Sequence, residues 1–255
     1  MTAALAFENL TLGYNRHPAV HHLSGEVAEG SLLAVIGPNG GGKSTLFRGI
    51  AGHLKPFAGS IRLNGVRVRD IAYLPQVAEI DRSFPIQVFD FVAMGLWGRR
   101  GAFKAITRTD RAAVEHALEQ VGLTGFESRT IGTLSGGQMQ RILFARLILQ
   151  DARVIVLDEP FNAIDAKTSA DLLALVQRWH SEGRTVLAAL HDDEVVRKNF
   201  PQTLLLARSP VAWGATGEVL TPENLARARE MCEAFDDRAE ACVDMTAPPS
   251  SSRAA

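Results

Sequence analysis

The sequence has little cysteine, no long hydrophobic run and almost no excess of either charge. Its 255 residues include 2 cysteines, Cys232 and Cys242, which come late in the chain without a histidine cluster beside them. This pattern favours reduced thiols in a cytosolic protein over a disulfide or a zinc site. No apolar stretch approaches the roughly 20 residues that a membrane-spanning helix needs, and the first residues lack the plan of a signal peptide. We therefore expect that this chain does not itself cross a membrane.

The charges nearly cancel. There are 27 lysines and arginines against 28 aspartates and glutamates, so the formal net charge is −1 at pH 7. No basic field is available to hold nucleic acid, and we expect no nucleic-acid partner. With 46% hydrophobic and 22% charged residues, the composition is that of a globular protein. The length allows one large α/β domain or two small ones.

The strongest motif is a glycine-rich loop between an apolar run, Leu32–Ile36, and a helical pattern. The loop matches the phosphate-loop template G-x-x-x-x-G-K-[ST] at every fixed position. Glycines let backbone N–H groups form a concave nest for an anion, and the start of a helix adds the positive end of its dipole. Lys43 can then reach the β- and γ-phosphates of a nucleotide, and the Ser44 hydroxyl can ligate Mg²⁺. A glycine-rich turn with a solvated lysine is the less favoured alternative. The residues predicted to bind nucleotide here are Gly37, Pro38, Asn39, Gly40, Gly41, Gly42, Lys43, Ser44 and Thr45.

A second anion-binding pattern occurs at Leu134–Gln138. Here Ser135, Gly136, Gly137 and Gln138 open a helix that becomes mostly apolar. A helix N-terminus with small residues offers unpaired N–H groups to an anion. The spacing alone does not explain why one chain needs two phosphate-binding elements.

Two carboxylates end the apolar run Val154–Leu157. Continuous apolarity suits a central strand of a parallel sheet, and such sheets bind ligands at the carboxyl ends of their strands. Asp158 can hold Mg²⁺ through water, and Glu159 can polarise a water for in-line attack on a γ-phosphate. Adjacent side chains of a strand point to opposite faces, so the two carboxylates cannot share one role. A turn with solvated acids is the disfavoured alternative.

Three further side chains are candidates on weaker signals. Gln76, after the expected strand Ile71–Leu74, can offer its amide oxygen to a metal ion or a water, although most such glutamines are solvated. His191, after the expected strand Thr185–Leu190, can hydrogen-bond a γ-phosphate or be structural. Tyr14 can stack on a flat base or simply be half buried at the end of a strand.

Other patterns predict local structure. The Asn64-Gly65 pair predicts a β-hairpin between residues 61–63 and 66–68. Thr203–Ala207 and residues 211–213 read as a closing strand pair, and the tail from Thr246 reads as disordered. The histidines at positions 17, 21 and 22 lack a carboxylate or cysteine to complete a metal site, so we expect them on the surface. A basic run is expected to be a solvated face, with a membrane surface or membrane partner as the sharper alternative; it comprises Arg99, Arg100, Lys104, Arg108 and Arg111.

Together, the motifs resemble those of the ATP-binding subunits of ABC transporters, in the same order and over roughly residues 4–230. Gly37–Thr45 is similar to Walker A, Leu134–Gln138 to the signature motif, and residues 154–159 to Walker B with Glu159 as the catalytic base. The resemblance implies further roles: base stacking for Tyr14, the Q-loop for Gln76, the D-loop for Asp165 and the switch histidine for His191.

The resemblance also implies a fold and a set of partners. The fold is α/β: a P-loop NTPase core with a mostly parallel central sheet, an N-terminal antiparallel β subdomain and an inserted α-helical subdomain. One domain would span residues 4–230, with the core and β subdomain at about 4–76 and 151–215, the helical subdomain at about 77–150, and a C-terminal extension at 231–255. ATP and Mg²⁺ are the implied cofactors. In this family two copies pack head to tail with each ATP between Walker A of one and the signature of the other, on a membrane permease at the cytoplasmic face of the inner membrane that works with a substrate-binding protein.

Within the family, the sequence is most similar to zinc and manganese importer ATPases of bacteria. The similar stretches are residues 71–76, 80–86, 92–95, 158–161 and 211–214. Two positions depart from the usual pattern: Gly41 in the phosphate loop, and the D-loop, which reads Asn-Ala-Ile-Asp at 162–165. Zinc uptake is favoured over manganese; uptake of iron chelates, haem or cobalamin is the same-fold alternative. A soluble, non-transport ABC ATPase is less favoured, because the chain lacks a long heptad insertion, a duplicated domain and a basic surface.

Overall fold

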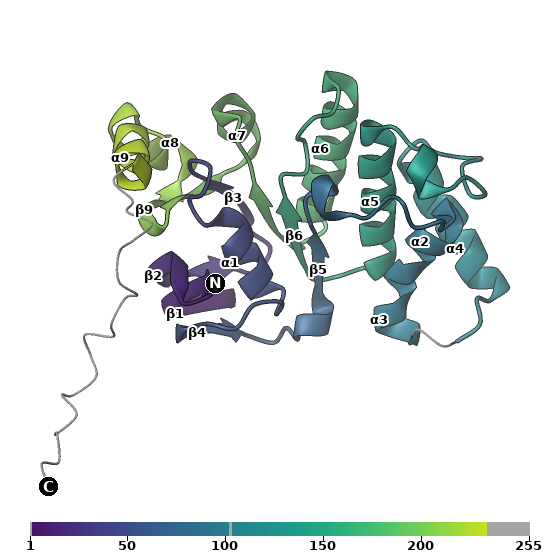
Figure 1. Ribbon diagram of the computed structural model, residues 1–255, viewed down its shortest axis with the longest axis horizontal. Helices are drawn as coiled ribbons and strands as arrows, with labels where there is room; N and C mark the ends of the chain where they lie inside the picture. Colours follow the sequence, from purple (N-terminus) through teal and green to yellow (C-terminus); the bar gives the residue numbers. More distant parts are fainter. Residues whose placement is uncertain (1, 102–103, 234–255) are drawn as a thin grey trace, which may run out of the picture.

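Figure 1 shows the computed structural model of the chain, which describes residues 2–101 and 104–233. Within these ranges the strands form a three-stranded sheet of order β2-β1-β4 and a six-stranded sheet of order β5-β6-β7-β3-β8-β9. The strands are β1 Ala3–Tyr14, β2 His17–Ala28, β3 Leu32–Ile36, β4 Ala58–Leu63, β5 Ile71–Leu74, β6 Val154–Asp158, β7 Thr185–Ala189, β8 Gln202–Ala207 and β9 Ser209–Ala215. The α-helices are α1 Lys43–Ile50, α2 Val88–Ala93, α3 Trp97–Arg100, α4 Arg108–Gln120, α5 Gly136–Gln150, α6 Ala166–Ser181, α7 Asp193–Asn199, α8 Thr216–Val219 and α9 Pro222–Glu233. Short 3₁₀ turns are η1 Val68–Asp70, η2 Val77–Glu79, η3 Met94–Leu96 and η4 Ile131–Thr133.

The central sheet is parallel apart from its last strand. β3 pairs in parallel with β7 and β8, and β6 pairs in parallel with β5 and β7, whereas β9 runs antiparallel to β8. Every residue of β3, β6 and β7 is buried, as expected of strands covered on both faces. The smaller sheet is antiparallel, with β1 in the middle. The predicted fold class is confirmed.

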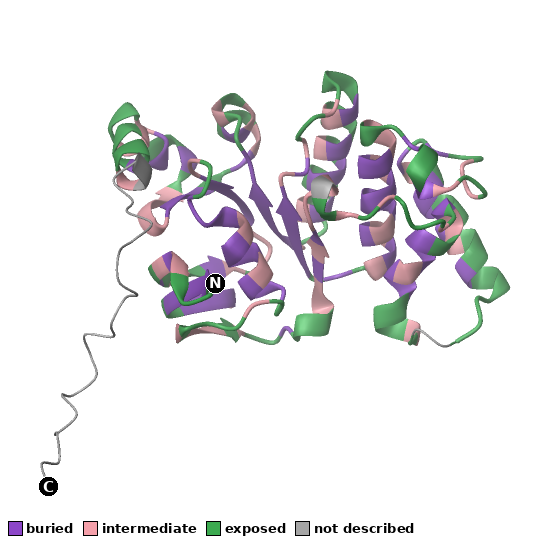
Figure 2. Ribbon diagram, viewed as in Figure 1, coloured by how far each residue is buried: buried purple, intermediate pink, exposed green. Residues whose placement is uncertain are grey.

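Two hydrophobic cores cover the two faces of the central sheet. Alternate residues of β3 enter different cores: Ala34 and Ile36 pack with residues of α5 and α6, whereas Leu33 and Val35 pack with α1 and the three-stranded sheet. Figure 2 shows this burial along the strands of the central sheet, while the outer helix α9 is largely exposed. Because β3, β6 and β7 run in the same direction, their carboxyl ends lie at one edge of the sheet.

The described residues between β5 and β6 form helices, 3₁₀ turns and loops. Figure 1 shows α2, α3, α4 and α5 together on one side of β5 and β6, with α1 on the other side. Placing domain boundaries at residues 77, 150 and 231 stays a prediction. Cys242 and the tail from Thr246 lie outside the described residues. Among the helices of the described ranges, none combines the length and apolarity needed to cross a bilayer.

The β-hairpin predicted at Asn64-Gly65 is wrong. Gly65 does adopt a positive φ of 68°, but β4 pairs with β1, with Leu63 opposite Leu5, and the next segment forms the 3₁₀ turn η1. A long central partner strand offers β4 more pairing than a local turn does. The chain after Gly65 then enters the central sheet as β5.

The basic run is not simply a solvated face. Arg99 pairs with Asp151, Arg100 pairs with Asp110, and the Arg111 guanidinium lies 4.6 Å from the centroid of the Phe89 ring. These contacts hold the helices of this region to one another.

Candidate active site

The phosphate loop leaves β3 and enters α1 in close contact with neighbouring backbone. A Cβ at Gly42, where φ is 94°, would lie 2.4 Å from the carbonyl oxygen of Ala19 on β2, so only glycine fits. Gly41 N–H donates to the carbonyl of Pro38 at 3.0 Å and closes the turn. The loop borders a cavity of about 420 Å³, which is lined by residues 39–45 together with Ala19, Gln76 and Glu159. The sequence-predicted loop residues therefore lie together with two of the other predicted site residues.

Lys43 is the first residue of α1 and is almost completely buried. Its ammonium group donates to the carbonyl oxygens of Gly37 at 2.8 Å and Pro38 at 3.0 Å. The lysine thus lies beneath the loop, where its charge adds to the field of the helix N-terminus on the phosphate cavity.

A hydroxyl, a carboxylate and an amide converge at the edge of this cavity. Ser44 Oγ donates to Oδ1 of Asp158 at 3.0 Å, and Gln76 Nε2 donates to Ser44 Oγ at 3.3 Å. Asp158 is fully buried, and this burial raises the pKa of its carboxyl group, an effect opposed by the hydrogen bond from Ser44. Oxygen ligands of this kind suit Mg²⁺, which usually takes one or two protein oxygens and keeps several waters and phosphate oxygens. The residues present fit that ion.

The second carboxylate faces other partners, but the alternation expected of a strand is not the reason, because β6 ends at Asp158. Glu159 Oε1 is 2.6 Å from His191 Nε2, and Glu159 Oε2 accepts a hydrogen bond from Asn162 Nδ2 at 3.1 Å. Glu159 has a positive φ of 51°, which turns its side chain away from that of Asp158. The carboxylate is held from both sides at the border of the phosphate cavity. This geometry suits a group that orients and deprotonates a water.

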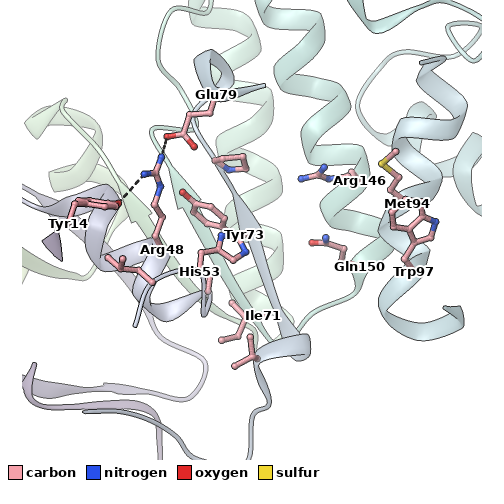
Figure 3. Close-up of a pocket in the computed structure, with 14 residues that line it drawn as sticks. Tyr14, Arg48, His53, Ile71, Tyr73, Glu79, Met94, Trp97, Arg146 and Gln150 are labelled. Atoms are coloured by element: carbon pink, nitrogen blue, oxygen red, sulfur yellow. Dashed lines mark hydrogen bonds and ion pairs between the residues drawn. The ribbon is translucent and has the colours of Figure 1, made fainter. Parts of the chain in front are cut away.

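Tyr14 lies at the end of β1, opposite His17 in the turn to β2. Its hydroxyl accepts a hydrogen bond from Arg48 Nη1 at 3.0 Å, and Arg48 also forms an ion pair with Glu79 (Figure 3). Tyr14 is 42% exposed and lines a different cavity from the phosphate loop. The structure does not bring Tyr14 into the phosphate cavity, and its stacking on a base stays a prediction.

We name this second cavity the groove cavity. It has a volume of about 810 Å³ and lies between α1, β5 and the helices α3 and α5. Its lining residues are Tyr14, Arg48, Ala51, His53, Leu54, Val68, Ile71, Tyr73, Pro75, Glu79, Met94, Trp97, Arg146 and Gln150. Trp97 and Val68 are about half exposed there, at 47% and 51%.

The predicted second anion element lies apart from the phosphate cavity. Ser135 is the N-cap of α5, where its hydroxyl accepts from Gln138 N–H at 3.2 Å and Gln138 Oε1 accepts from Ser135 N–H at 3.0 Å. None of the residues 135–138 lines the phosphate cavity, and α5 and α1 lie on opposite sides of β5 and β6 (Figure 1). Within one copy, the structure does not bring the two phosphate-binding elements together.

Three side chains of the site were missed by sequence reasoning. Asn162 contacts Glu159, Tyr73 O–H donates to Oδ2 of Asp158 at 3.3 Å, and Arg48 joins Tyr14 to Glu79. Burial, and then the charge of Asp158, raise the pKa of Tyr73, so its hydroxyl stays protonated and donates. Of these three side chains, only Asn162 had a signal in the sequence: it begins the unusual Asn-Ala-Ile-Asp sequence of the D-loop.

The histidines near the N-terminus form no metal site. His22 Nδ1 lies 2.8 Å from Asn9 Oδ1, and burial lowers the pKa of His21. Across the described ranges no three histidine, cysteine, aspartate or glutamate side chains gather in a way that would hold a metal ion. A Mg²⁺ ion would therefore depend on phosphate oxygens and water as well as on Ser44 and Asp158.

A phosphate loop and an acidic strand end, at the same edge of a mostly parallel sheet, place the protein among the P-loop ATPases. The model of the ABC transporter family matches residues 20–162, and the chain belongs to this family. It is 38% identical to the manganese transport system ATP-binding protein MntA of Synechocystis sp., over 87% of this chain and 88% of that protein. It is also 38% identical to the zinc transport system ATP-binding protein TroB of Treponema pallidum, over 88% of this chain and 86% of that protein.

Solved structures agree with the family. One structure, described as a metal-chelate type ABC transporter in an inward-facing conformation, superposes with a TM-score of 0.79 and 32% identity. The superposition covers 90% of this chain and 90% of that chain. The predicted family and its ATPase activity are confirmed.

Proposed function

We propose that this chain is the ATP-hydrolysing subunit of an importer for a divalent metal ion, with zinc ahead of manganese as cargo. The observation that carries the proposal is the likeness, over most of the chain, to ATP-binding proteins named for manganese and for zinc transport. Those names do not rank the two metals. The order follows the sequence prediction alone.

The geometry supports a division of labour among the site residues. Residues 37–45 bind the triphosphate, with Lys43 as the cation beneath it. A bound Mg²⁺ ion would supply positive charge against the charge that develops during phosphoryl transfer. Ser44 and Asp158 would hold that ion, and Gln76 is within reach of Ser44.

Glu159 is proposed as the base that orients the attacking water. His191 and Asn162 fix its carboxylate, and His191 is proposed from the sequence pattern to contact the γ-phosphate. Tyr14 is proposed to provide the stacking surface for adenine.

The active site is proposed to be completed by a second copy of the chain. Ser135, Gly136, Gly137 and Gln138 would contact the ATP bound at the phosphate loop of the other copy, in a head-to-tail dimer. Their separation from the phosphate cavity of their own chain supports this arrangement. The helix α5, here called the signature helix, would then place the positive end of its dipole against the far side of the nucleotide.

A membrane permease is the proposed partner outside the dimer, and with it a substrate-binding protein. The groove cavity beside Gln76, with its half-exposed Trp97 and Val68, is a suitable contact surface for a permease segment (Figure 3). The chain would then lie at the cytoplasmic face of the cell membrane, held there by the permease.

Uptake of a metal chelate is the second candidate. The likeness to the structure described as a metal-chelate type transporter favours it over other cargoes. The same site residues would serve either cargo.

Growth of a deletion strain tests the cargo. We expect poor growth under zinc limitation, a lowered cell zinc content, and rescue by the wild-type gene but not by Glu159→Gln. A defect confined to manganese limitation would reverse the order of the two metals. A defect confined to growth on an iron chelate would replace the proposal by its alternative.

A further inference from the structure

Tyr73 contacts both the proposed magnesium site and the groove cavity. Its hydroxyl donates to Oδ2 of Asp158 at 3.3 Å. Its ring lines the groove cavity and meets the His53 ring edge-on, with centroids 5.4 Å apart and an interplanar angle of 77° (Figure 3). One side chain therefore reaches from the groove to the carboxylate that would hold the ion.

The strand explains this position. β5 is the edge strand of the central sheet, and its residues alternate between the two faces. Ala72 and Leu74 are buried in the core beneath α5, whereas Ile71 and Tyr73 pack at the border of the core beside α1. Within the described residues β5 has a strand neighbour on one side only, and the Tyr73 ring on its face lines the groove cavity.

Two hydroxyl donors fix the Asp158 carboxylate. Ser44 donates to Oδ1, and Tyr73 donates to Oδ2. Asp158 has no exposed surface, so an oxygen that loses its donor is left with the full cost of desolvation. Phenylalanine in place of Tyr73 would remove the hydroxyl and keep the ring.

Tyr73 also lies beside a charged cluster in the groove cavity, formed by Arg48 and Glu79. A group bound in the groove cavity could interact with this cluster. The Arg48 guanidinium hydrogen-bonds Tyr14, forms an ion pair with Glu79 and lies beside Tyr73. Glu79 belongs to η2, the turn that follows Gln76. A group that enters the groove and draws Glu79 or Arg48 towards itself changes the surroundings of the Tyr73 ring.

We propose that Tyr73 is a positioning residue that orients the Asp158 carboxylate for Mg²⁺ and links that carboxylate to the state of the groove cavity. The inference rests on the proposed magnesium site of Ser44 and Asp158, and not on the identity of the cargo.

Calorimetric titration of the full-length chain with ATP, with and without Mg²⁺, tests the proposal. We expect Tyr73→Phe to reduce the gain in affinity that Mg²⁺ provides by about five- to tenfold and to change the metal-free affinity by less than about twofold. Gln150→Leu is the control, because Gln150 also lines the groove cavity but belongs to α5 and has no part in the proposed nucleotide or magnesium site. It should leave the gain from Mg²⁺ unchanged.

Two further measurements test the link to the groove and the contact of Tyr73 with the Asp158 carboxylate. Arg48→Met should reduce the gain from Mg²⁺, and the Arg48→Met/Tyr73→Phe double variant should lose no more than Tyr73→Phe alone. In a chain labelled with 3-fluorotyrosine, the Tyr73 resonance should move when Mg²⁺ is added to the ATP complex, with Tyr14→Phe assigning the two signals.

The contrary results are distinct. A wild-type gain from Mg²⁺ in Tyr73→Phe, or an equal loss of affinity with and without the ion, overturns the positioning role. An unaltered gain in Arg48→Met overturns the link to the groove, and a Tyr73 resonance that ignores Mg²⁺ overturns the positioning role. A wild-type chain whose ATP affinity does not respond to Mg²⁺ overturns the magnesium site itself, and the inference with it.

Discussion

At the scale of single residues, the site separates two neighbouring carboxylates by giving them different partners. Asp158 is buried and accepts from hydroxyls, whereas Glu159 turns to His191 and Asn162. The positive φ of Glu159 makes this divergence possible at the end of a strand. One carboxylate is thereby suited to a metal ion and the other to a water.

Glu159→Gln should retain ATP binding and lose at least about 100-fold in turnover, because a general base contributes that much or more. ATP-bound protein should then accumulate as a dimer, measured by phosphate release and by size-exclusion chromatography with ATP. Lys43→Ala is the control, which should lose ATP binding as well. Wild-type turnover in Glu159→Gln would show that another group acts as the base.

Gly42→Ala should disrupt the phosphate loop, because its Cβ would lie 2.4 Å from the Ala19 carbonyl oxygen. We expect at least about tenfold weaker ATP binding and a lower Tm. Gly40→Ala is the matched control: its φ of 76° is also positive, but no atom lies within 4 Å of the added Cβ. If the two variants behave alike in ATP titrations and thermal melts, contact with β2 is not what requires glycine.

The residues of the site differ in how well the sequence predicts them. Lys43, Ser44 and the two carboxylates belong to motifs whose spacing carries the chemistry. Tyr73 and Asn162 do not: Tyr73 reaches Asp158 only because β5 and β6 pair side by side, and such long-range pairing leaves no local signal. Asn162 stands out only as a departure from a pattern.

At the scale of elements, the predicted site residues include the N-termini of three helices, α1, α5 and α6. These N-termini differ in their caps. Gly42 precedes α1 without a side-chain cap, so its N–H groups remain available to an anion, whereas Ser135 caps α5 and Asp165 caps α6. Asp165 Oδ1 accepts from Thr168 N–H at 2.9 Å. Of these three helices, α1 is the one without a side-chain cap, and its first residues line the phosphate cavity.

Asp165→Asn should change the pH dependence of stability. Hydrogen bonds from the Thr168 backbone and side chain lower the pKa of Asp165 in the folded state, so this group stabilises the fold above its unfolded pKa and stops doing so as pH falls through the lower, folded value. The variant should therefore be less stable than wild type at pH 7, with a difference that shrinks below about pH 4. Urea unfolding of both proteins at pH 7 and below about pH 4 measures the difference in the free energy of unfolding. Asp165→Ser, which caps without titrating, should behave in the same way, and a difference independent of pH would contradict the account.

Element types were predictable, but one pairing was not. The buried strands β3, β6 and β7 were evident from continuous apolar runs. The Asn64-Gly65 signal placed a bend in the chain correctly and the partner strand of β4 wrongly, because β1 competes for β4 from far away in the sequence. Likewise, the Ser135-x-x-Gln138 spacing is a capping box, which the anion-binding interpretation did not anticipate.

At the scale of the whole molecule, each copy would contribute the phosphate loop to one ATP site of the proposed dimer and residues 135–138 to the other. The phosphate cavity and the N-terminus of α5 lie apart within one copy, and in the proposed dimer a second copy would bring them together. Ser135→Arg should accordingly leave ATP affinity of the isolated chain within about twofold and abolish turnover. Lost ATP binding in that variant would mean that Ser135 serves the site of its own chain.

Mixing two inactive variants tests this arrangement most directly. Lys43→Ala lacks a working phosphate loop, and Ser135→Arg lacks a working signature helix, so each alone should be inactive. In a mixture of equal amounts, half of the dimers would contain one copy of each variant and one intact composite site, which predicts about a quarter of wild-type ATPase activity. A mixture no more active than its separate components would contradict the shared site.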